Sequence, residues 1–271
     1  VSYVDLWGES ECPEKSLLEF SGHIMGDMDG QPNDFACVDS PRVVAKGPRR
    51  YNSGGRLHLA ETTEGAAPMY SKNFEVACSR CGVIAEPGAS YTHWGNGTCP
   101  AGDITVYSGY MVGTQSPAMS PYLCLGRDAD LRSFSSRTQA GPQLYPVEYS
   151  EMHGLGPALT SLYNSEAICS LCRARDKEWT IVVPGRPDCP VVGGFELAYS
   201  GYLMSEHSSS ARTHYVCVDK GAEGIPGSGS FGVSSATLYP VELAGATCAG
   251  TADTPSCTAT ATGTCPEGCN N

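Results

Sequence analysis

Long apolar runs are absent from this chain of 271 residues, and positive charge is scarce. No stretch approaches the roughly twenty consecutive apolar residues that a transmembrane helix requires, so we expect no membrane span. Lysine and arginine number 17, against 29 aspartates and glutamates, which gives a formal net charge of −12. Such a surface repels phosphate backbones, so we also expect no nucleic-acid partner.

Catalytic signatures are lacking as well. The sequence contains no nucleophile elbow, no His-Glu-x-x-His motif and no Walker loop. The carboxylates that recur in a pattern are Glu61, Glu148 and Glu242, and three equivalent positions indicate a structural partner rather than one active site. We therefore predict a protein without enzymatic activity and without a cofactor.

Long helical periodicity is the third absence. The 32 glycines and 19 prolines favour short strands joined by many turns. Phe195, Leu197 and Tyr199 alternate with more polar residues, a pattern typical of a strand with one buried face. A short helical turn is expected only at residues 157–162. The predicted fold class is therefore all-β with very little helix.

Cysteine, by contrast, is abundant. Fourteen cysteines exceed what the stability of a chain of this size demands, and the even count suggests seven bridges formed in an oxidising compartment. We expect Val1 to begin a mature chain from which a signal peptide has been removed. The triplet Asn96-Gly97-Thr98 is an N-glycosylation sequon, so Asn96 is predicted to be exposed and glycosylated. Together these features predict a secreted, extracellular protein.

Five landmarks recur three times in the same order, which predicts three tandem units of about ninety residues with pseudo-threefold organisation. Each unit has a Cys-Pro, an aromatic-Ser-Gly strand, a strand with a cysteine, a closing strand with a glutamate, and a close cysteine pair. These landmarks are Cys12-Pro13, Phe20-Ser21-Gly22, Cys37, Glu61 and Cys78/Cys81 in residues 1–84; Cys99-Pro100, Tyr107-Ser108-Gly109, Cys124, Glu148 and Cys169/Cys172 in residues 85–174; and Cys189-Pro190, Tyr199-Ser200-Gly201, Cys217, Glu242 and Cys265/Cys269 in residues 175–271. The third unit adds a Thr/Ala-rich tail at 247–264, expected to be irregular.

The four cysteines of one unit allow three connectivities. Joining the two members of a close pair would make a tight, reducible loop, so we favour bridges from that pair back to the two earlier cysteines, without deciding between the two remaining patterns. Three such units use twelve cysteines and leave Cys248 to pair with Cys257. The alternative is a Cys₄ zinc site, because Cys78-Ser-Arg-Cys81 has knuckle spacing. Tetrahedral sites usually combine two knuckles, however, and each unit has one.

The landmarks resemble the non-collagenous C-terminal domain of type IV collagen, and resemble spongin-type short-chain collagen C4-like proteins still more closely. The resemblance rests on Cys99-Pro100, Tyr107 to Gly113, Tyr122 to Leu125 and Cys169-Ser-Leu-Cys172, with counterparts in the flanking units. It implies an extracellular matrix setting and the bridges Cys12–Cys81, Cys37–Cys78, Cys99–Cys172, Cys124–Cys169, Cys189–Cys269 and Cys217–Cys265. Unlike the collagen domain, which has two longer repeats, this chain has three, and it has no Gly-X-Y tract.

The leading functional hypothesis is a secreted, non-enzymatic structural or assembly protein of the extracellular matrix, with itself or other matrix proteins as partners. The alternative is a multivalent carbohydrate-binding lectin, or a defensive toxin built on one, because three linked weak sites gain avidity for glycans.

Two acidic or histidine-bearing loops are candidate metal sites. Asp27, Asp29 and Asp34 offer clustered oxygens for calcium but lack the distal bidentate glutamate of an EF-hand, so a solvated loop is the preferred interpretation. Glu206, His207 and His214 lie in a serine-rich turn, where a polar loop is the default.

Overall fold

A computed structural model describes the chain at residues 2–27, 34–39, 57–63, 70–83, 88–115, 120–134, 141–152, 155, 157–191, 193–207, 209–210, 214–225, 228, 236–241, 246–251 and 254–259, the last two ranges as backbone only. Strands dominate it, and the single helix among these residues is α1, Pro157–Thr160. The all-β prediction and the short helical turn are confirmed. Below, the first, second and third segments mean residues 1–84, 85–174 and 175–271.

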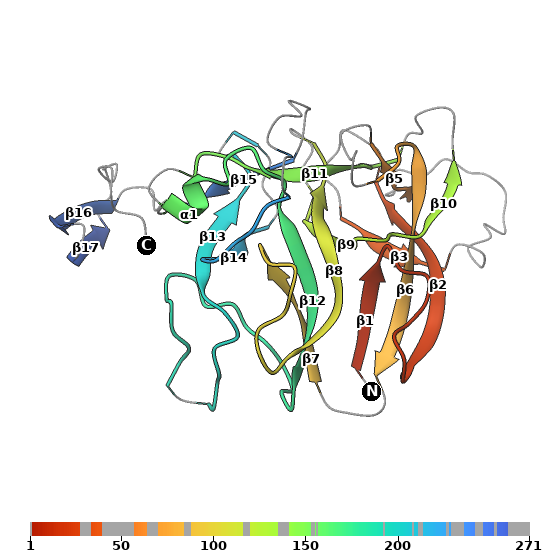
Figure 1. Cartoon of the computed structure of the whole chain (residues 1–271), viewed down its shortest axis with the longest axis horizontal. Coiled ribbons are helices and arrows are strands. Elements are labelled where there is room, and N and C mark those ends of the chain that lie inside the picture. The colour runs from red at the N-terminus through yellow and green to blue at the C-terminus, as the bar shows by residue number, and fades with distance from the viewer. Residues whose placement is uncertain are drawn as a thin grey trace, which may run out of the picture.

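The strands form three groups that follow one another across the molecule (Figure 1). The first segment contains β1 Ser2–Trp7, β2 Ser16–Gly26, β3 Ala36–Val38, β4 His58–Leu59, β5 Glu61–Thr62 and β6 Phe74–Val83. The second contains β7 Gly88–Trp94, β8 Ile104–Gly113, β9 Leu123–Gly126, β10 Leu131–Phe134, β11 Gln143–Tyr149 and β12 Ile168–Arg175. The third contains β13 Gly201–Ser205, β14 Val216–Asp219, β15 Ala236–Pro240, β16 Ala246–Thr251 and β17 Thr254–Ala259.

In the first two segments, the strand that carries the close cysteine pair is the central one. Strand β6 pairs antiparallel with both β1 and β2, and β12 pairs antiparallel with both β7 and β8. The register is the same in both, because Gly22 lies opposite Cys78 and Gly109 lies opposite Cys169. We call β6 and β12 the central strands.

The glycine of each aromatic-Ser-Gly landmark permits a close backbone approach. A Cβ added at Gly22, Gly109 or Gly201 would lie 1.8, 2.3 or 1.7 Å from the carbonyl oxygen of the following cysteine-bearing strand. Real Cβ atoms never come so close to backbone, so only glycine fits there. The interpretation of these glycines as sites of close approach is confirmed.

Neighbouring segments are joined by parallel strand pairs in a repeated register. Glu61 of β5 lies opposite Gln143 of β11, and Glu148 of β11 lies opposite Thr237 of β15. In both cases, the recurring glutamate faces a position five residues before the recurring glutamate of the next segment (148−143 and 242−237). One continuous sheet of 15 strands therefore runs through all three segments.

Each of the two main hydrophobic clusters crosses a segment boundary. One cluster contains Ile24 and Val76 of the first segment with Leu125 and Leu144 of the second. The other combines second-segment residues such as Tyr149 with residues of β13, β14 and β15. Apolar burial is the main source of folding free energy, so the segments depend on their neighbours for stability.

The third segment departs from the sequence-based expectation in two places. Residues 195–200 are not a strand, although Phe195, Leu197 and Tyr199 alternate, and Leu197 is 53% exposed. The corresponding parts of β2 and β8 are held by a central strand, which residues 195–200 lack among the described residues. Part of the tail expected to be irregular forms the β16–β17 hairpin. Its β-branched threonines explain this strand propensity.

Candidate functional site

Four disulfide bridges frame the first two segments. Cys12–Cys81 and Cys37–Cys78 close the first segment, while Cys99–Cys172 and Cys124–Cys169 close the second; their Cα–Cα distances are 5.7 to 5.8 Å. This is the pairing that the collagen-domain resemblance implies, and none of these bridges crosses residue 84 or 174. The zinc alternative is wrong for these eight cysteines, because a bridged sulfur cannot act as a thiolate ligand.

In the third segment, Cys189 and Cys217 are in no bridge among the described residues, and the bridges expected with Cys269 and Cys265 stay a prediction. Cys265 and Cys269 lie outside the described residues. Cys248 lies directly opposite Cys257 in the β16–β17 register, but their side chains are also outside the description. Burial raises the pKa of the Cys217 thiol, so it stays protonated at neutral pH.

Around these thiols, the third segment leaves apolar side chains uncovered. Ile181 and Val182, in the stretch corresponding to β1 and β7, are 44% and 61% exposed. Trp179 packs edge-on against Phe195, with ring centroids 5.1 Å apart, and is 59% exposed. Residues 178–191 and 193–202, together with Cys217, correspond to the parts of the first two segments that lie around the central strand.

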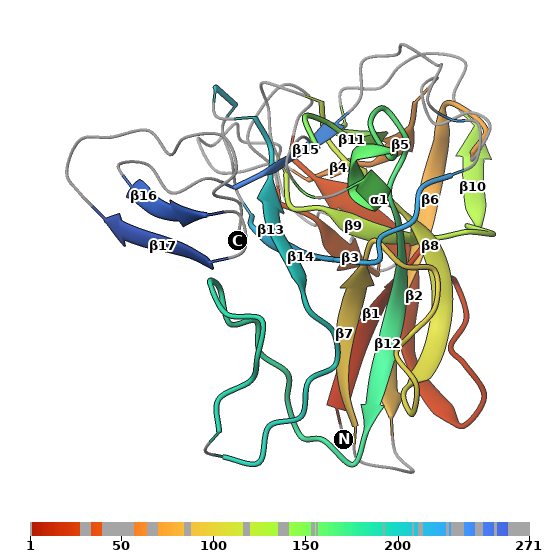
Figure 2. The same cartoon turned by 60° about the vertical axis from the view of Figure 1, so that its left-hand side comes forward.

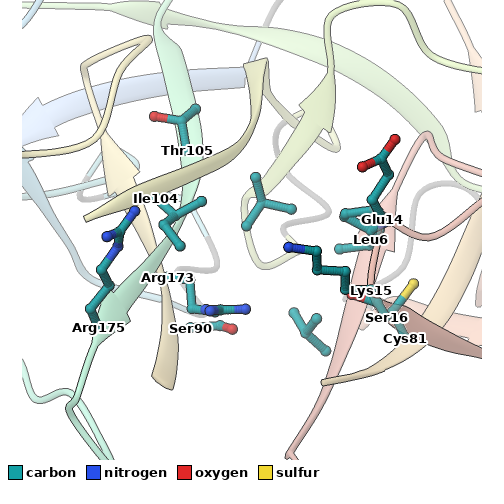
Figure 3. A pocket seen from close by; sticks show the side chains of 13 residues that line it. Leu6, Glu14, Lys15, Ser16, Cys81, Ser90, Ile104, Thr105, Arg173 and Arg175 are labelled. Carbon is teal, nitrogen blue, oxygen red and sulfur yellow. The ribbon is translucent and has the colours of Figure 1, made fainter. Parts of the chain in front are cut away.

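A cavity of about 350 Å³ lies between the first and second segments (Figure 3). Its floor is apolar and includes Leu6 and Ile104. Figure 3 shows Lys15 and Glu14 on one wall and Arg173 and Arg175 on the other. Ser16, Ser90 and Thr105 add hydroxyl groups to the lining. Three cations and one carboxylate in a chain of net charge −12 make this cavity suited to an anionic ligand with an apolar part.

Sequence reasoning missed this cavity. Its walls come from the strands β1, β6, β7, β8 and β12, from the first residue of β2 and from the turn before it, so no short motif marks the cavity. One sequence feature could have indicated the cavity. Arg173 and Arg175 occupy alternate positions of a cysteine-bearing strand in an acidic chain. Alternate positions share one face of a strand.

The junction between the second and third segments is polar and buried. The Nε2 of His93 lies 2.6 Å from a carboxylate oxygen of Asp219, and the amide of Thr237 donates to Glu206 at 2.9 Å. The hydroxyl of Tyr122 also donates to Glu206. Burial raises the pKa of the Glu206 carboxyl group. Glu206, which was considered with His207 and His214 as a metal site, instead fastens β15 to the end of β13.

The remaining candidate residues occupy separate places. Asn96 is half-buried in the turn after β7, and its side-chain oxygen accepts from the amide and hydroxyl of Thr98 at 3.0 Å. Asp27 follows β2, Asp34 accepts from the amide of Phe35 at 2.9 Å, and Asp29 lies outside the described residues. Within the part of the chain that the structure describes, no three His, Cys, Asp or Glu side chains are grouped to hold a metal ion.

The recurring glutamates lie at the parallel junctions. Glu61 is 2% exposed and Glu148 is half-buried, whereas Glu242 is outside the description. None of the described helices is both long and apolar enough for a membrane crossing. No protein-family model matches the chain, and no solved structure matches it.

Proposed function

We propose that this protein is a secreted, non-enzymatic structural or assembly protein of the extracellular matrix, built from three copies of one disulfide-framed unit. The observation that carries this proposal is the bridge pattern. Two segments have the same two bridges in the same register around a central strand, and this is the pattern that the resemblance to the collagen domain implies. Fourteen cysteines, enough for seven bridges, also suit an oxidising, extracellular compartment.

The joins between segments support an assembly role. The amide of Asp130 donates to the carbonyl of Gly8 at 2.7 Å, and the amide of Glu223 donates to the carbonyl of Gly95 at 2.8 Å. Asp130 and Glu223 each lie six residues after the strand cysteine of their segment (130−124 and 223−217). Each join is therefore made between two different faces, and the same two faces are used at both joins. Such head-to-tail contacts are heterologous, and a heterologous contact can extend into rings or filaments.

Nothing among the described strands pairs the first segment with the third. The outward faces of the first and third segments are therefore available for the head-to-tail contact that joins neighbouring segments within the chain. Sedimentation velocity and light scattering, from low micromolar to several hundred micromolar protein, test this proposal. We expect larger species to accumulate with concentration and the protein to bind a reconstituted matrix. A protein that stays monomeric throughout and binds no matrix component would contradict the proposal.

A second candidate function is a lectin for acidic glycans, and the cavity between the first two segments favours it. Arginine side chains donate paired, charge-assisted hydrogen bonds to carboxylate and sulfate groups, and the apolar floor suits the face of a sugar ring. On a glycan array, binding should be confined to sulfated or uronic-acid sugars.

The variant Arg175→Gln should weaken binding to a sulfated oligosaccharide by about fivefold, because one charge-assisted contact is lost. Lys220→Gln removes an equally exposed cation outside the cavity and should leave binding unchanged. Equal losses in both variants would show that net charge alone attracts the sugar. An array without hits would remove the lectin hypothesis.

A further inference from the structure

The cavity lies at the join between the first and second segments, which we call the first join; the second join links the second and third segments through the same contacts. Positions in one join therefore correspond to positions in the other. Val4, which lines the cavity, lies opposite Cys81, the second member of its close cysteine pair. Tyr91 lies opposite Cys172, the second member of the next pair. Tyr91 thus stands in the second join where Val4 stands in the first.

Tyr91 shows what fills this position in the second join. Its hydroxyl donates to the carboxylate of Asp103, and its ring stacks on Tyr199 with centroids 6.4 Å apart. Ser16 takes the place of Asp103 at the cavity. Each of the two lies four residues after the cysteine of its Cys-Pro, and its amide donates to the carbonyl of that proline at 3.1 Å. The first join therefore has a valine and a serine where the second has a phenol ring and its acceptor.

The surface on which that ring rests is present in the first join as well. Tyr107 corresponds to Tyr199, and each hydroxyl donates to the carbonyl of the strand cysteine of its own segment at 2.9 Å. Tyr107 packs with Val4 and Leu6 in one apolar cluster. A planar ring that enters the cavity can therefore lie against Tyr107 as the ring of Tyr91 lies against Tyr199.

Cations surround this ring-sized space. Figure 3 shows Lys15 and Arg173 reaching toward each other from opposite walls, with Arg175 on the same strand as Arg173. Lys15 has a left-handed φ of 66°, and its counterpart in the second segment is Gly102, with a φ of 101°. This conformation is costly for lysine and not for glycine. The first segment thus keeps an amine at the cavity wall in a strained conformation, and an anion held between the walls would offset that cost.

We propose that the cavity binds an aromatic ring that carries a sulfate group, such as the side chain of an O-sulfated tyrosine. The ring takes the place of the phenol that fills the second join, and the sulfate accepts charge-assisted hydrogen bonds from Lys15, Arg173 and Arg175. A volume of about 350 Å³ is near the lower end for ligand pockets and suits one substituted ring. The inference rests on the proposed role in binding matrix partners, and it names an aryl sulfate where the lectin hypothesis has a sugar.

Titration calorimetry on the full-length protein tests this ligand chemistry with matched probes. The probes are a short glycine-serine peptide with one central O-sulfated tyrosine, the same peptide with unmodified tyrosine, free tyrosine O-sulfate, and a sulfated oligosaccharide. We expect the sulfated peptide to bind at least about tenfold more tightly than the unmodified peptide and the oligosaccharide, because both ring and charge are used. Equal affinity for free tyrosine O-sulfate would identify a small aryl sulfate as the source of the ligand, and tighter binding of the peptide would identify a polypeptide.

Two variants test whether the ligand occupies the cavity. Val4→Tyr/Ser16→Asp introduces the pair that fills the second join, so its own phenol should take the ligand's place and weaken binding of the sulfated peptide by more than about tenfold. Lys15→Gly should weaken binding by about fivefold, because one charge-assisted contact is lost. Its melting temperature should stay within about 2 °C of wild type, because relief of the left-handed strain offsets the greater freedom of glycine in the unfolded chain. Lys220→Gln, which removes an exposed cation outside the cavity, is the control and should bind like wild type.

The absence of binding, equal affinity for the sulfated and unmodified peptides, or an oligosaccharide that binds as tightly as the sulfated peptide would each overturn the inference. Wild-type affinity in the double variant would overturn it too. If the double variant fails to fold, the comparison of probes on the wild-type protein and the Lys15→Gly variant still decides. Sedimentation measures self-assembly separately, so the assembly proposal can fail while this site stands, and the site can fail while assembly stands.

Discussion

The bridge between Cys124 and Cys169 offers a quantitative test of the frame. The bridge fastens β9 to the central strand β12 and closes a loop with a sequence separation of 45. Its two residues are 3% and 0% exposed, so we choose the double variant Cys124→Ala/Cys169→Ala, which introduces no buried hydroxyl group. The chain-entropy estimate for a loop of this length gives a loss of about 4 kcal/mol in unfolding free energy.

A loss of that size lowers the melting temperature by roughly 10 °C for a protein of this length. Calorimetry, and urea unfolding followed by tryptophan fluorescence, measure this loss of stability. Because the bridge restricts the unfolded chain, its removal should also steepen the dependence of unfolding free energy on urea, since the unfolded chain expands.

The bridge Cys37–Cys78 is the matched control, with a sequence separation of 41. The chain-entropy estimate for the two loops differs by about 0.1 kcal/mol, so the variant Cys37→Ala/Cys78→Ala should lose nearly the same stability. A loss below about 1 kcal/mol for either variant, or a difference above about 2 kcal/mol between them, would refute the reasoning from loop closure.

Two further predictions concern single positions. Gly201→Ala should lower the unfolding free energy measured in urea by more than about 2 kcal/mol, because the added Cβ would meet the carbonyl of Val218. Gly97→Ala is the control. Its Cβ would meet only ordinary contacts, so its unfolding free energy should stay within about 0.5 kcal/mol of wild type. Burial raises the folded-state pKa of Glu206 above its unfolded value, so the stability it contributes is complete below the unfolded pKa and is lost as pH rises through the folded pKa. Melting curves between about pH 4 and pH 7 should therefore show Glu206→Gln gaining stability relative to wild type as pH rises, and parallel curves would contradict this.

The sequence was sufficient to predict those features of the fold that depend on local chemistry or on the repeated landmarks. The cysteine landmarks led to the four bridges through the family resemblance, and the Ser-Gly landmarks indicated the close approach at Gly109. The cavity could not be predicted, because Lys15 and Arg175 meet only when two segments pack. The strand predicted from the alternation of apolar and polar residues at 195–200 is wrong for a related reason. A strand needs a partner for its backbone groups, and periodicity does not report whether a partner is present.

The shared cores explain how β13, β14 and β15 are held although no central strand lies among the described residues of the third segment. Met204, Val216 and Leu238 are buried against second-segment residues rather than against a core of their own. Figure 2 shows β13 and β14 continuing the sheet beyond β7. Strand β14 is joined to β7 by the pairing of Val218 with Trp94. These strands are therefore stabilised by the second segment. Tyr199 is held there too, because its hydroxyl donates to the carbonyl of Thr92 at 3.3 Å and its ring centroid lies 4.2 Å from that of His93.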